Sequence, residues 1–378
     1  MDAQVTGEIL RVFQSLPEPR RHNVRHKLID ILTLALLGVI CGADGWVAVA
    51  AYARAKEAWL KTFLELPEGI PSHDTFGRVF ARLNPEAFEQ CFVAWISTLV
   101  ELSGGKLVAI DGKSLRRSFE HGWDKSGMAH MVSAFVQANH LVFGQVKTDG
   151  KGQELDGIAK LLAILDLEGA VVTIDALGCQ KSIAGLIVEA RADYILQVKD
   201  NQPTLHAQLQ TLLAEAVLEK LVGWRGDTCQ TVDGDHGRIE TRTLTVVWDV
   251  QHLGVLARDW PGLKSVVLLE RTREIRGQVS TEKHYYISTL DRRRTARQFL
   301  EYIRGHWSIE NNCHWQLDVS FNEDQRRIRQ DHGAENFSRL CRIALNLLKN
   351  EPTQKTGIAI KRQTCGWDNQ YLLKVLAG

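Results

Sequence analysis

The order of strand-like and helical segments after residue 105 constrains the fold of this chain more than any other feature. Three apolar, strand-like segments follow one another at 106–114, 131–139 and 140–148, with a turn-like Ala138-Asn139 near the join of the last two. A helical segment at 154–166 leads to a strand at 170–178, a helix at 180–190 and a strand at 192–200. Consecutive strands followed by crossover helices predict an α/β fold with a mixed sheet. No GxGxxG follows any strand, so we expect no nucleotide cofactor.

The residues before this sheet are expected to be helical throughout. Apolar residues recur at helical spacing in 8–16, 27–41, 46–64 and 86–103. Ser72 or Asp74 can cap a further helix that ends before Pro85. Two helices joined by a tight turn are compatible with a DNA-binding helix-turn-helix, although most such pairs are packing units. We therefore predict an all-α N-terminal domain at 1–103 that binds DNA or mediates dimerisation.

A second strand-rich region interrupts the predicted α/β domain. After a helix at 204–222, strand-like segments occupy 243–250, 265–275 and 283–290, and helical spacing returns over 297–321 and 334–349. This order predicts a core in two parts, 104–203 and 291–350, separated by a β-rich insertion at 204–290 and followed by a tail at 351–378. Whether the insertion forms a sheet of its own stays open.

Composition limits where DNA could bind and where the protein works. The chain has 378 residues, and its 46 Lys and Arg nearly balance its 45 Asp and Glu, so any surface for nucleic acid must be local. Seven cysteines without a CxxC pair are typical of a reduced, intracellular protein. The first residues do not resemble a secretory signal, and the most apolar run, 28–41, is too short for a membrane span. We expect a cytoplasmic protein with no membrane partner.

Three acidic residues are the strongest candidates for chemistry. Asp111 follows the apolar run LVAI, and Asp175 follows VVTI, so each lies where a buried strand ends and α/β proteins present ligands. Glu310 lies in the segment HWSIENN. Each Asp could instead form a turn or cap a helix, and Glu310 could be a solvated carboxylate. Three convergent carboxylates would suit Mg²⁺ or Mn²⁺. We expect no structural zinc, because His306, Cys313, His314 and His332 lack the paired spacing of a zinc site.

Several long segments, in this order, resemble one family: the DDE transposases of bacterial insertion sequences, in the branch of the H-repeat-associated proteins. These segments are GIPSHDTFGRVFARLNP, IDGKSLRRS, TIDALGCQ, ADYILQVKDNQ, HGRIETR and HWSIENNCHWQLDVSFNEDQRRIR. The resemblance implies a catalytic core similar to ribonuclease H. It also implies that Asp111, Asp175 and Glu310 are the catalytic, metal-ligating residues.

The resemblance further implies a reaction and its partners. The chain would cleave DNA at the ends of an insertion sequence and transfer the strand, using two Mg²⁺ ions, or Mn²⁺, at each site. Its partners would be double-stranded DNA with terminal inverted repeats, target DNA and a second copy in an active homodimer. Two alternatives stay open: a retired transposase that binds DNA without moving it, and a metal-dependent nuclease without strand transfer.

The segment around Glu310 departs from the pattern of related transposases. They place Tyr, Arg and Lys where this chain has Ile303, His306 and Leu317. His306 could contact a phosphate or a flipped base, or it could be a packed helix histidine. Trp307 and Trp315 could stack on bases, although aromatic residues at helical spacing are more often part of a core.

The remaining candidates for DNA contact are mostly basic residues in charge-rich segments. Solvated turns, internal salt bridges and cross-strand pairs are the alternative interpretations of the same charges. The full set of candidates is Arg20, Arg21, Arg25, Lys113, Arg116, Arg117, His236, Arg238, Arg242, Arg304, His306, Trp307, Arg326, Arg327 and Arg329.

Overall fold

The computed structural model describes residues 7–22, 24–100, 102, 105–119, 128–148, 150, 152–235 and 237–377. The chain divides into two compact units. The first unit comprises 1–101, 112–165 and 309–378, and the second comprises 102–111 and 166–308. The division falls between Asp111 and Gly112, inside a single strand. No helix in the described parts of the chain is long and apolar enough to cross a membrane.

The described N-terminal segments of the first unit form six helices. Ser72 caps α5 by accepting a hydrogen bond from the Thr75 N–H at 3.3 Å. Asn84 caps α6 in the same way, with Pro85 in its first turn. The predicted helix at 46–64 is instead two helices, α3 and α4. The helices are α1 (Glu8–Phe13), α2 (Leu28–Ile40), α3 (Trp46–Ala55), α4 (Glu57–Leu60), α5 (His73–Arg82) and α6 (Pro85–Leu99).

The C-terminal helices of this unit pack around one long, buried helix. This helix, α13 (Gly333–Asn350), contacts α2, α5 and α6. Residues 351–378, expected to be a tail, contain the helices α14 (Ile358–Trp367) and α15 (Asn369–Ala377). Lys361 of α14 donates a hydrogen bond to the Leu348 carbonyl at 2.8 Å, which ties α14 to the end of α13. The unit also contains α7 (Glu154–Ile164), α12 (Trp315–Val319) and a 3₁₀ turn (Glu323–Gln325).

The strands of the described residues form a nine-stranded mixed sheet in the order β3-β2-β1-β4-β5-β9-β8-β7-β6. Strand β1 pairs in parallel with β4, and β4 pairs in parallel with β5, whereas β2–β3 and all pairs from β5 to β6 are antiparallel. This mixed direction is what the sequence predicts. The strands are β1 (Leu107–Ser114), β2 (His130–Val136), β3 (Leu141–Thr148), β4 (Val171–Ile174), β5 (Asp193–Val198), β6 (Gly226–Asp235), β7 (Arg238–Val247), β8 (Ser265–Ile275) and β9 (Gln278–Ser288).

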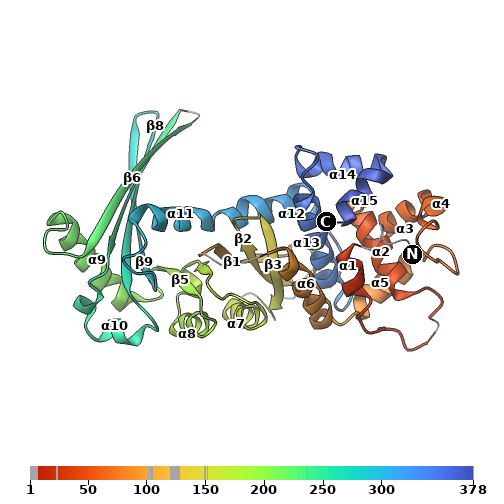
Figure 1. Ribbon diagram of the computed structural model, residues 1–378, viewed down its shortest axis with the longest axis horizontal. Coiled ribbons are helices and arrows are strands. Elements are labelled where there is room, and N and C mark those ends of the chain that lie inside the picture. Colours follow the sequence, from red (N-terminus) through yellow and green to blue (C-terminus); the bar gives the residue numbers. More distant parts are fainter. Residues whose placement is uncertain are drawn as a thin grey trace. The chain divides into compact units, whose positions relative to one another are not determined.

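The strands of residues 204–290 do not form a sheet of their own. Strand β9 pairs directly with β5, so β6 to β9 extend the same sheet as the strands before them. Figure 1 shows these four long strands, green to cyan, as one ribbon. The second unit also contains α8 (Lys181–Glu189), α9 (Pro203–Leu218), α10 (Val255–Asp259), α11 (Ala296–His306) and the 3₁₀ turns Ala176–Gly178 and Val250–Leu253.

Helix α11 covers part of this ribbon. It begins with a capping box in which Thr295 and Gln298 exchange hydrogen bonds. Phe299, Leu300 and Ile303 of α11 are buried against Leu244 and other residues of β7 and β8. Each such side chain stabilises the unit by roughly 1.5–3 kcal/mol relative to exposure. The ribbon therefore shares a core with the helix that leads toward Glu310.

In the first unit, the outer edge of β3 is closed by side chains. The Asn346 amide accepts a hydrogen bond from the Val142 N–H at 2.9 Å and donates one to the Val142 carbonyl at 2.7 Å. The Glu89 carboxylate accepts a hydrogen bond from the Gln145 N–H at 2.7 Å. Side chains thus satisfy backbone groups that a further strand would otherwise pair with.

Candidate active site

Asp111 and Asp175 follow equivalent positions of two neighbouring strands. The register of β1 and β4 pairs Ile110 with Ile174, and an aspartate follows each isoleucine. Strand β4 ends at Ile174, whereas β1 continues through Asp111 to Ser114, so Asp111 lies within its strand and not at the strand end that the sequence predicts. Both isoleucines are buried, whereas Asp111 is half-buried and Asp175 is exposed. The two aspartates therefore directly follow the last paired residues of β1 and β4.

Asp175 also has a local structural role. Its carboxylate accepts a hydrogen bond from the Leu177 N–H at 3.1 Å and so caps the turn Ala176–Gly178. Asn201 donates a hydrogen bond to the Ala176 carbonyl at 2.7 Å, which holds the same turn. The capping role that the sequence left open for this residue is present.

Glu310 begins a π-helical turn instead of lying in the continuous helix predicted for 297–321. Helix α11 ends at His306, the π-helix spans Glu310–His314, and α12 follows directly. Lys113 donates a hydrogen bond to the carbonyl of His314 at 3.3 Å, and Lys349 donates one to that of Asn312 at 2.6 Å. π-Helical turns of this kind are rare and frequently lie at functional sites.

The π-helical turn brings His314 against Glu310. Nδ1 of His314 lies 3.1 Å from Oε2 of Glu310, and the carboxylate can only accept, so the imidazole donates when Glu310 is ionised. This hydrogen bond and the positive charges of His314 and Lys113 hold the pKa of Glu310 below its ordinary value, against the effect of burial. Glu310 is therefore ionised at neutral pH.

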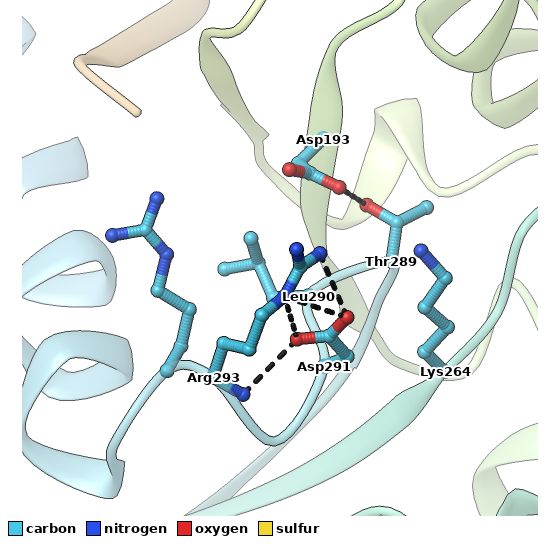
Figure 2. A pocket seen from close by; sticks show the side chains of 7 residues that line it. Asp193, Lys264, Thr289, Leu290, Asp291 and Arg293 are labelled. Carbon is cyan, nitrogen blue, oxygen red and sulfur yellow. Dashed lines mark hydrogen bonds and ion pairs between the residues drawn. The ribbon is translucent and has the colours of Figure 1, made fainter. Parts of the chain in front are cut away.

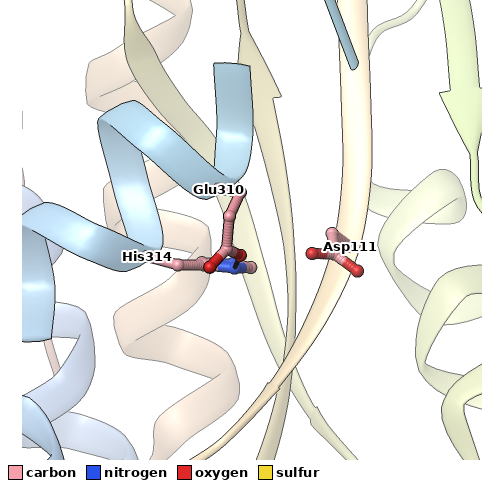
Figure 3. Close-up of side chains that lie close together, drawn as sticks. All are labelled: Asp111, Glu310 and His314. Carbon is pink, nitrogen blue, oxygen red and sulfur yellow. Dashed lines mark hydrogen bonds and ion pairs between the residues drawn. The ribbon is translucent and has the colours of Figure 1, made fainter. Parts of the chain in front are cut away.

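One group of side chains in the described residues could hold a metal ion: Asp111, Glu310 and His314 (Figure 3). Each offers one ligand atom, and these atoms all lie within 4.8 Å of one another. Asp175 is not part of this group of described residues. Two carboxylates fit Mg²⁺ or Mn²⁺, and an imidazole is a ligand better suited to transition metals such as Mn²⁺ than to Mg²⁺.

Lys113 lies in a buried ion network. Its ammonium pairs with Asp318 and lies 3.6 Å from Glu323, and its side chain is only 9% exposed. Burial raises the pKa of Glu323, but the charges of Arg342, Lys113 and Arg326 outweigh burial and lower it to about 2. Lys113 is thus held in internal ion pairs and is not a solvated turn charge.

The other basic candidates near this network also have internal contacts. Arg116 pairs with Asp324 at 3.2 Å but remains mostly exposed. Arg329 donates to the carbonyl of the half-buried Arg117 at 3.2 Å. The guanidinium groups of Arg326 and Arg329 lie over the rings of Phe337 and Phe119, respectively, and Arg327 is exposed.

The candidates on the ribbon surround one buried glutamate. Glu240 of β7 pairs with Arg238, Arg242, Arg271 and Arg273, and its side chain is 4% exposed. Burial raises the pKa of Glu240, but hydrogen bonds from Arg271 and Arg238 and the neighbouring charges outweigh it and lower the pKa to about 2. We call these five residues the arginine cluster.

Two further ribbon candidates border this cluster. Arg304 of α11 pairs with Asp233 at 3.1 Å, and Arg242 pairs with the same aspartate. His236 lies outside the described residues.

The aromatic and histidine candidates near the end of α11 differ in exposure. Nδ1 of the half-buried His306 lies 3.0 Å from the Thr173 hydroxyl of β4. Trp307 is 63% exposed and Trp315 is 52% exposed, so neither belongs to a core within its unit. Their faces are available for stacking.

In the N-terminal segment, Arg20 is held by its neighbours whereas Arg21 and Arg25 are exposed. Arg20 pairs with Glu18 at 2.6 Å and donates to the His26 carbonyl at 2.7 Å.

Sequence reasoning missed several residues that the structure places with the candidates. His314 could have been found from its spacing, because a residue four positions after Glu310 lies on the same helix face. Arg271 and Arg273 could not, because only the pairing of β7 with β8 brings them to Glu240.

Known protein families match nearly the whole chain. The family described as "DDE_Tnp_1-associated" matches residues 10–96, and the family described as "Transposase DDE domain" matches residues 102–347.

Curated proteins of similar length also match. The chain is 39% identical to "Putative transposase YncI" of Escherichia coli O157:H7 over 373 residues, which cover 98% of this chain and 94% of that protein. It is 38% identical to "H repeat-associated putative transposase YhhI" of Escherichia coli K12 over 364 residues, which cover 94% of each.

A solved structure of a piggyBac transposase synaptic complex with hairpin DNA matches with a TM-score of 0.42 and 11% identity, over 98% of this chain and 78% of that one. A likeness this distant carries no argument. The transposase family match covers most of the chain, and the curated relatives match along nearly their full length. The chain therefore belongs to the DDE transposase family, in the branch of the H-repeat-associated proteins.

Proposed function

We propose that this transposase cleaves DNA at the ends of an insertion sequence and joins the freed 3′-OH to target DNA, using Mg²⁺ or Mn²⁺. The observation that carries the proposal is the approach of the Asp111 and Glu310 carboxylates, with His314, to within 4.8 Å in a member of this family. Asp111 and Asp175 share one edge of the parallel strands, which supports Asp175 as the third carboxylate.

The core would be similar to that of ribonuclease H. Support comes from the strand order β3-β2-β1-β4-β5, in which a first antiparallel group is followed by parallel strands. We assign the catalytic aspartates to β1 and to the end of β4, and the catalytic glutamate to the π-helical turn.

The side chains of the site have two different roles, metal binding and positioning. Asp111, Asp175 and Glu310 supply the oxygen ligands for two divalent ions. With the ions bound, charge on the phosphate is neutralised and the attacking hydroxyl group becomes more acidic. His314 is a positioning residue, because its hydrogen bond fixes the orientation of the Glu310 carboxylate and keeps it ionised.

Exposed cations and aromatic faces would bind the DNA. In the arginine cluster, Arg238 is 42% exposed and is the cation best placed to reach a phosphate, whereas Arg242 is 13% exposed and pairs with both Glu240 and Asp233. Arg21, Arg25, Arg327 and the exposed Trp307 are further contacts in this proposal. The DNA partners would be the inverted-repeat ends and the target, held by a homodimer.

Cleavage of labelled DNA tests the proposal. The substrate is a duplex taken from the sequence that flanks the coding region, incubated with the purified chain and Mg²⁺, Mn²⁺ or EDTA. We expect cleavage and joined products with either metal and none with EDTA. Asp111→Asn, Asp175→Asn and Glu310→Gln keep the side-chain shape and remove a ligand charge, so each is expected to abolish cleavage.

A matched control separates the site from general loss of charge. Glu215→Gln removes one exposed carboxylate from α9 and is expected to cleave normally. Full cleavage by any of the three site variants would refute that residue's role. Binding without cleavage by the wild type would favour a retired transposase, and cleavage without a joined product would favour a nuclease.

A further inference from the structure

A basic pocket lies at the far end of the parallel strands from Asp111 and Asp175. The cavity has a volume of about 320 Å³ and is lined by Asp193, Lys264, Thr289, Leu290, Asp291, Arg293 and Arg294, all of the second unit (Figure 2). Asp193 begins β5, Lys264 precedes β8, and Thr289 follows β9. None of the three cations is among the individual residues that the sequence singled out for DNA contact.

The two carboxylates of the pocket already have partners. Asp193 accepts a hydrogen bond from the Thr289 hydroxyl at 2.7 Å, and Asp291 pairs with Arg293 at 2.9 Å. In Figure 2, Lys264 and Arg293 lie on either side of the Thr289–Asp291 segment. Among the residues that the structure describes, no hydrogen bond or ion pair reaches the Lys264 ammonium or the Arg294 guanidinium. With Lys264, Arg293 and Arg294 against Asp193 and Asp291, the pocket lining has one more cation than carboxylates.

The Arg294 guanidinium lies close to the backbone of a glycine turn. Gly105 has a φ of +81°, and a Cβ on it would lie 2.6 Å from Nη2 of Arg294. Tyr302 of α11 donates a hydrogen bond to the Gly105 carbonyl at 3.0 Å, so the turn is fixed to the helix that follows Arg294. Only glycine leaves room for the guanidinium in this position.

The pocket lies at a distance from the acidic edge that suits DNA. Asp193 pairs with Val171 at the start of β4, whereas Asp175 follows the end of β4. Four strand residues separate the two ends, which is about 13 Å at 3.3 Å per residue. This is close to the axial rise of about four base pairs of duplex.

We propose that Lys264, Arg293 and Arg294 bind a phosphodiester group of the DNA backbone other than the one that is cleaved. We call this contact the anchor. The inference rests on the proposed function, because it identifies the anion bound in this pocket as DNA. Guanidinium and ammonium groups that face solvent are charged hydrogen-bond donors, and phosphate oxygens accept such hydrogen bonds.

Salt dependence of DNA binding tests the anchor. The affinity of a fluorescent duplex of arbitrary sequence is measured for the full chain between 0.05 and 0.3 M salt, a range chosen as roughly that over which phosphate contacts are resolved. The slope is that of the logarithm of the DNA-binding constant against the logarithm of the salt concentration. The double variant Lys264→Gln/Arg294→Gln removes two phosphate contacts, so it should flatten this slope by about 1.8 and weaken DNA binding roughly 60-fold at 0.1 M salt. Gly105→Ala displaces Arg294 without changing charge and should flatten the slope by about 0.9.

The control pair is Lys160→Gln/Arg258→Gln, which removes two exposed charges from α7 and α10. An equal change in this control and in the pocket variant would overturn the proposal, as would an unchanged slope in a pocket variant that melts like the wild type. Tighter binding of inorganic phosphate than of duplex would assign the pocket to a free anion and overturn the DNA anchor. If the wild type binds and cleaves DNA, and the pocket variant shows the same salt dependence of DNA binding as the wild type, only the anchor is refuted. No DNA binding by the wild type would refute the proposed function as well.

Discussion

Glu240 is expected to stabilise the ribbon through its charge, and Glu240→Gln tests this. The surrounding arginines lower the pKa of Glu240 from 4.5 to about 2 in the folded chain. At 1.36 kcal/mol per unit, this shift corresponds to about 3 kcal/mol of stability. Because the folded pKa is depressed, the contribution is complete above about pH 4.5 and is lost as pH falls toward 2.

The assay compares urea unfolding of the wild type and Glu240→Gln at several pH values between 7 and 3, with hydrogen exchange of the β7 and β8 amides as the local measurement. The variant should be less stable by about 3 kcal/mol at pH 7, and the difference should shrink as the wild-type carboxylate is protonated. Other carboxylates titrate in both proteins, so their effects cancel in the difference.

A double-mutant cycle with Arg271 adds a second check. Arg271 donates its Nε–H to Glu240, so Arg271→Met should cost less stability in the Glu240→Gln background than in the wild type. Equal stability of wild type and Glu240→Gln at pH 7, or a difference that does not change with pH, would refute the reasoning.

Three other outcomes follow from the site. Lys113→Met leaves the buried Glu323 with one positive neighbour fewer and should lower the unfolding free energy by about 3 kcal/mol, with Lys160→Met as the control; an unchanged urea midpoint would contradict this. His314→Ala should reduce metal-dependent cleavage while His314→Asn, whose amide can replace the Nδ1 donor, retains more of it; equal activity of the two would refute the positioning role. Trp307→Ala should change stability by less than about 0.5 kcal/mol but weaken single-stranded DNA binding by about 1–3 kcal/mol, and unchanged affinity would exclude stacking.

The local sequence pattern is sufficient to predict most strands, although β1 continues past Asp111 to Ser114. The runs before Asp111 and Asp175 are fully buried strands, because continuous apolar residues in a parallel sheet are covered on both faces. Strand β6 was missed because GDTCQTVDGD has few apolar residues and carries glycine and aspartate, which strands disfavour. It forms through its ladder with β7.

Which residues come together at the candidate site, and in which local conformation, depends on tertiary contacts that sequence spacing does not reveal. Apolar periodicity over 297–321 indicates a helix, but it does not reveal the π-helical turn at Glu310, which Lys113 and Lys349 support from distant segments. The sequence makes Lys113 a candidate for DNA contact, whereas tertiary packing gives it Asp318 and Glu323 as partners. Lys264 and Arg294 share a pocket only because β8 and α11 begin at the same end of the sheet.

The closed edge of β3 has a consequence for how copies of this protein meet. An exposed edge strand can recruit a strand from another molecule, which leads to aggregation at high local concentration. Asn346 and Glu89 occupy the backbone groups of Val142 and Gln145 that such a strand would need. A strand of another molecule therefore cannot extend the sheet at these residues of β3 unless it displaces the Asn346 and Glu89 side chains.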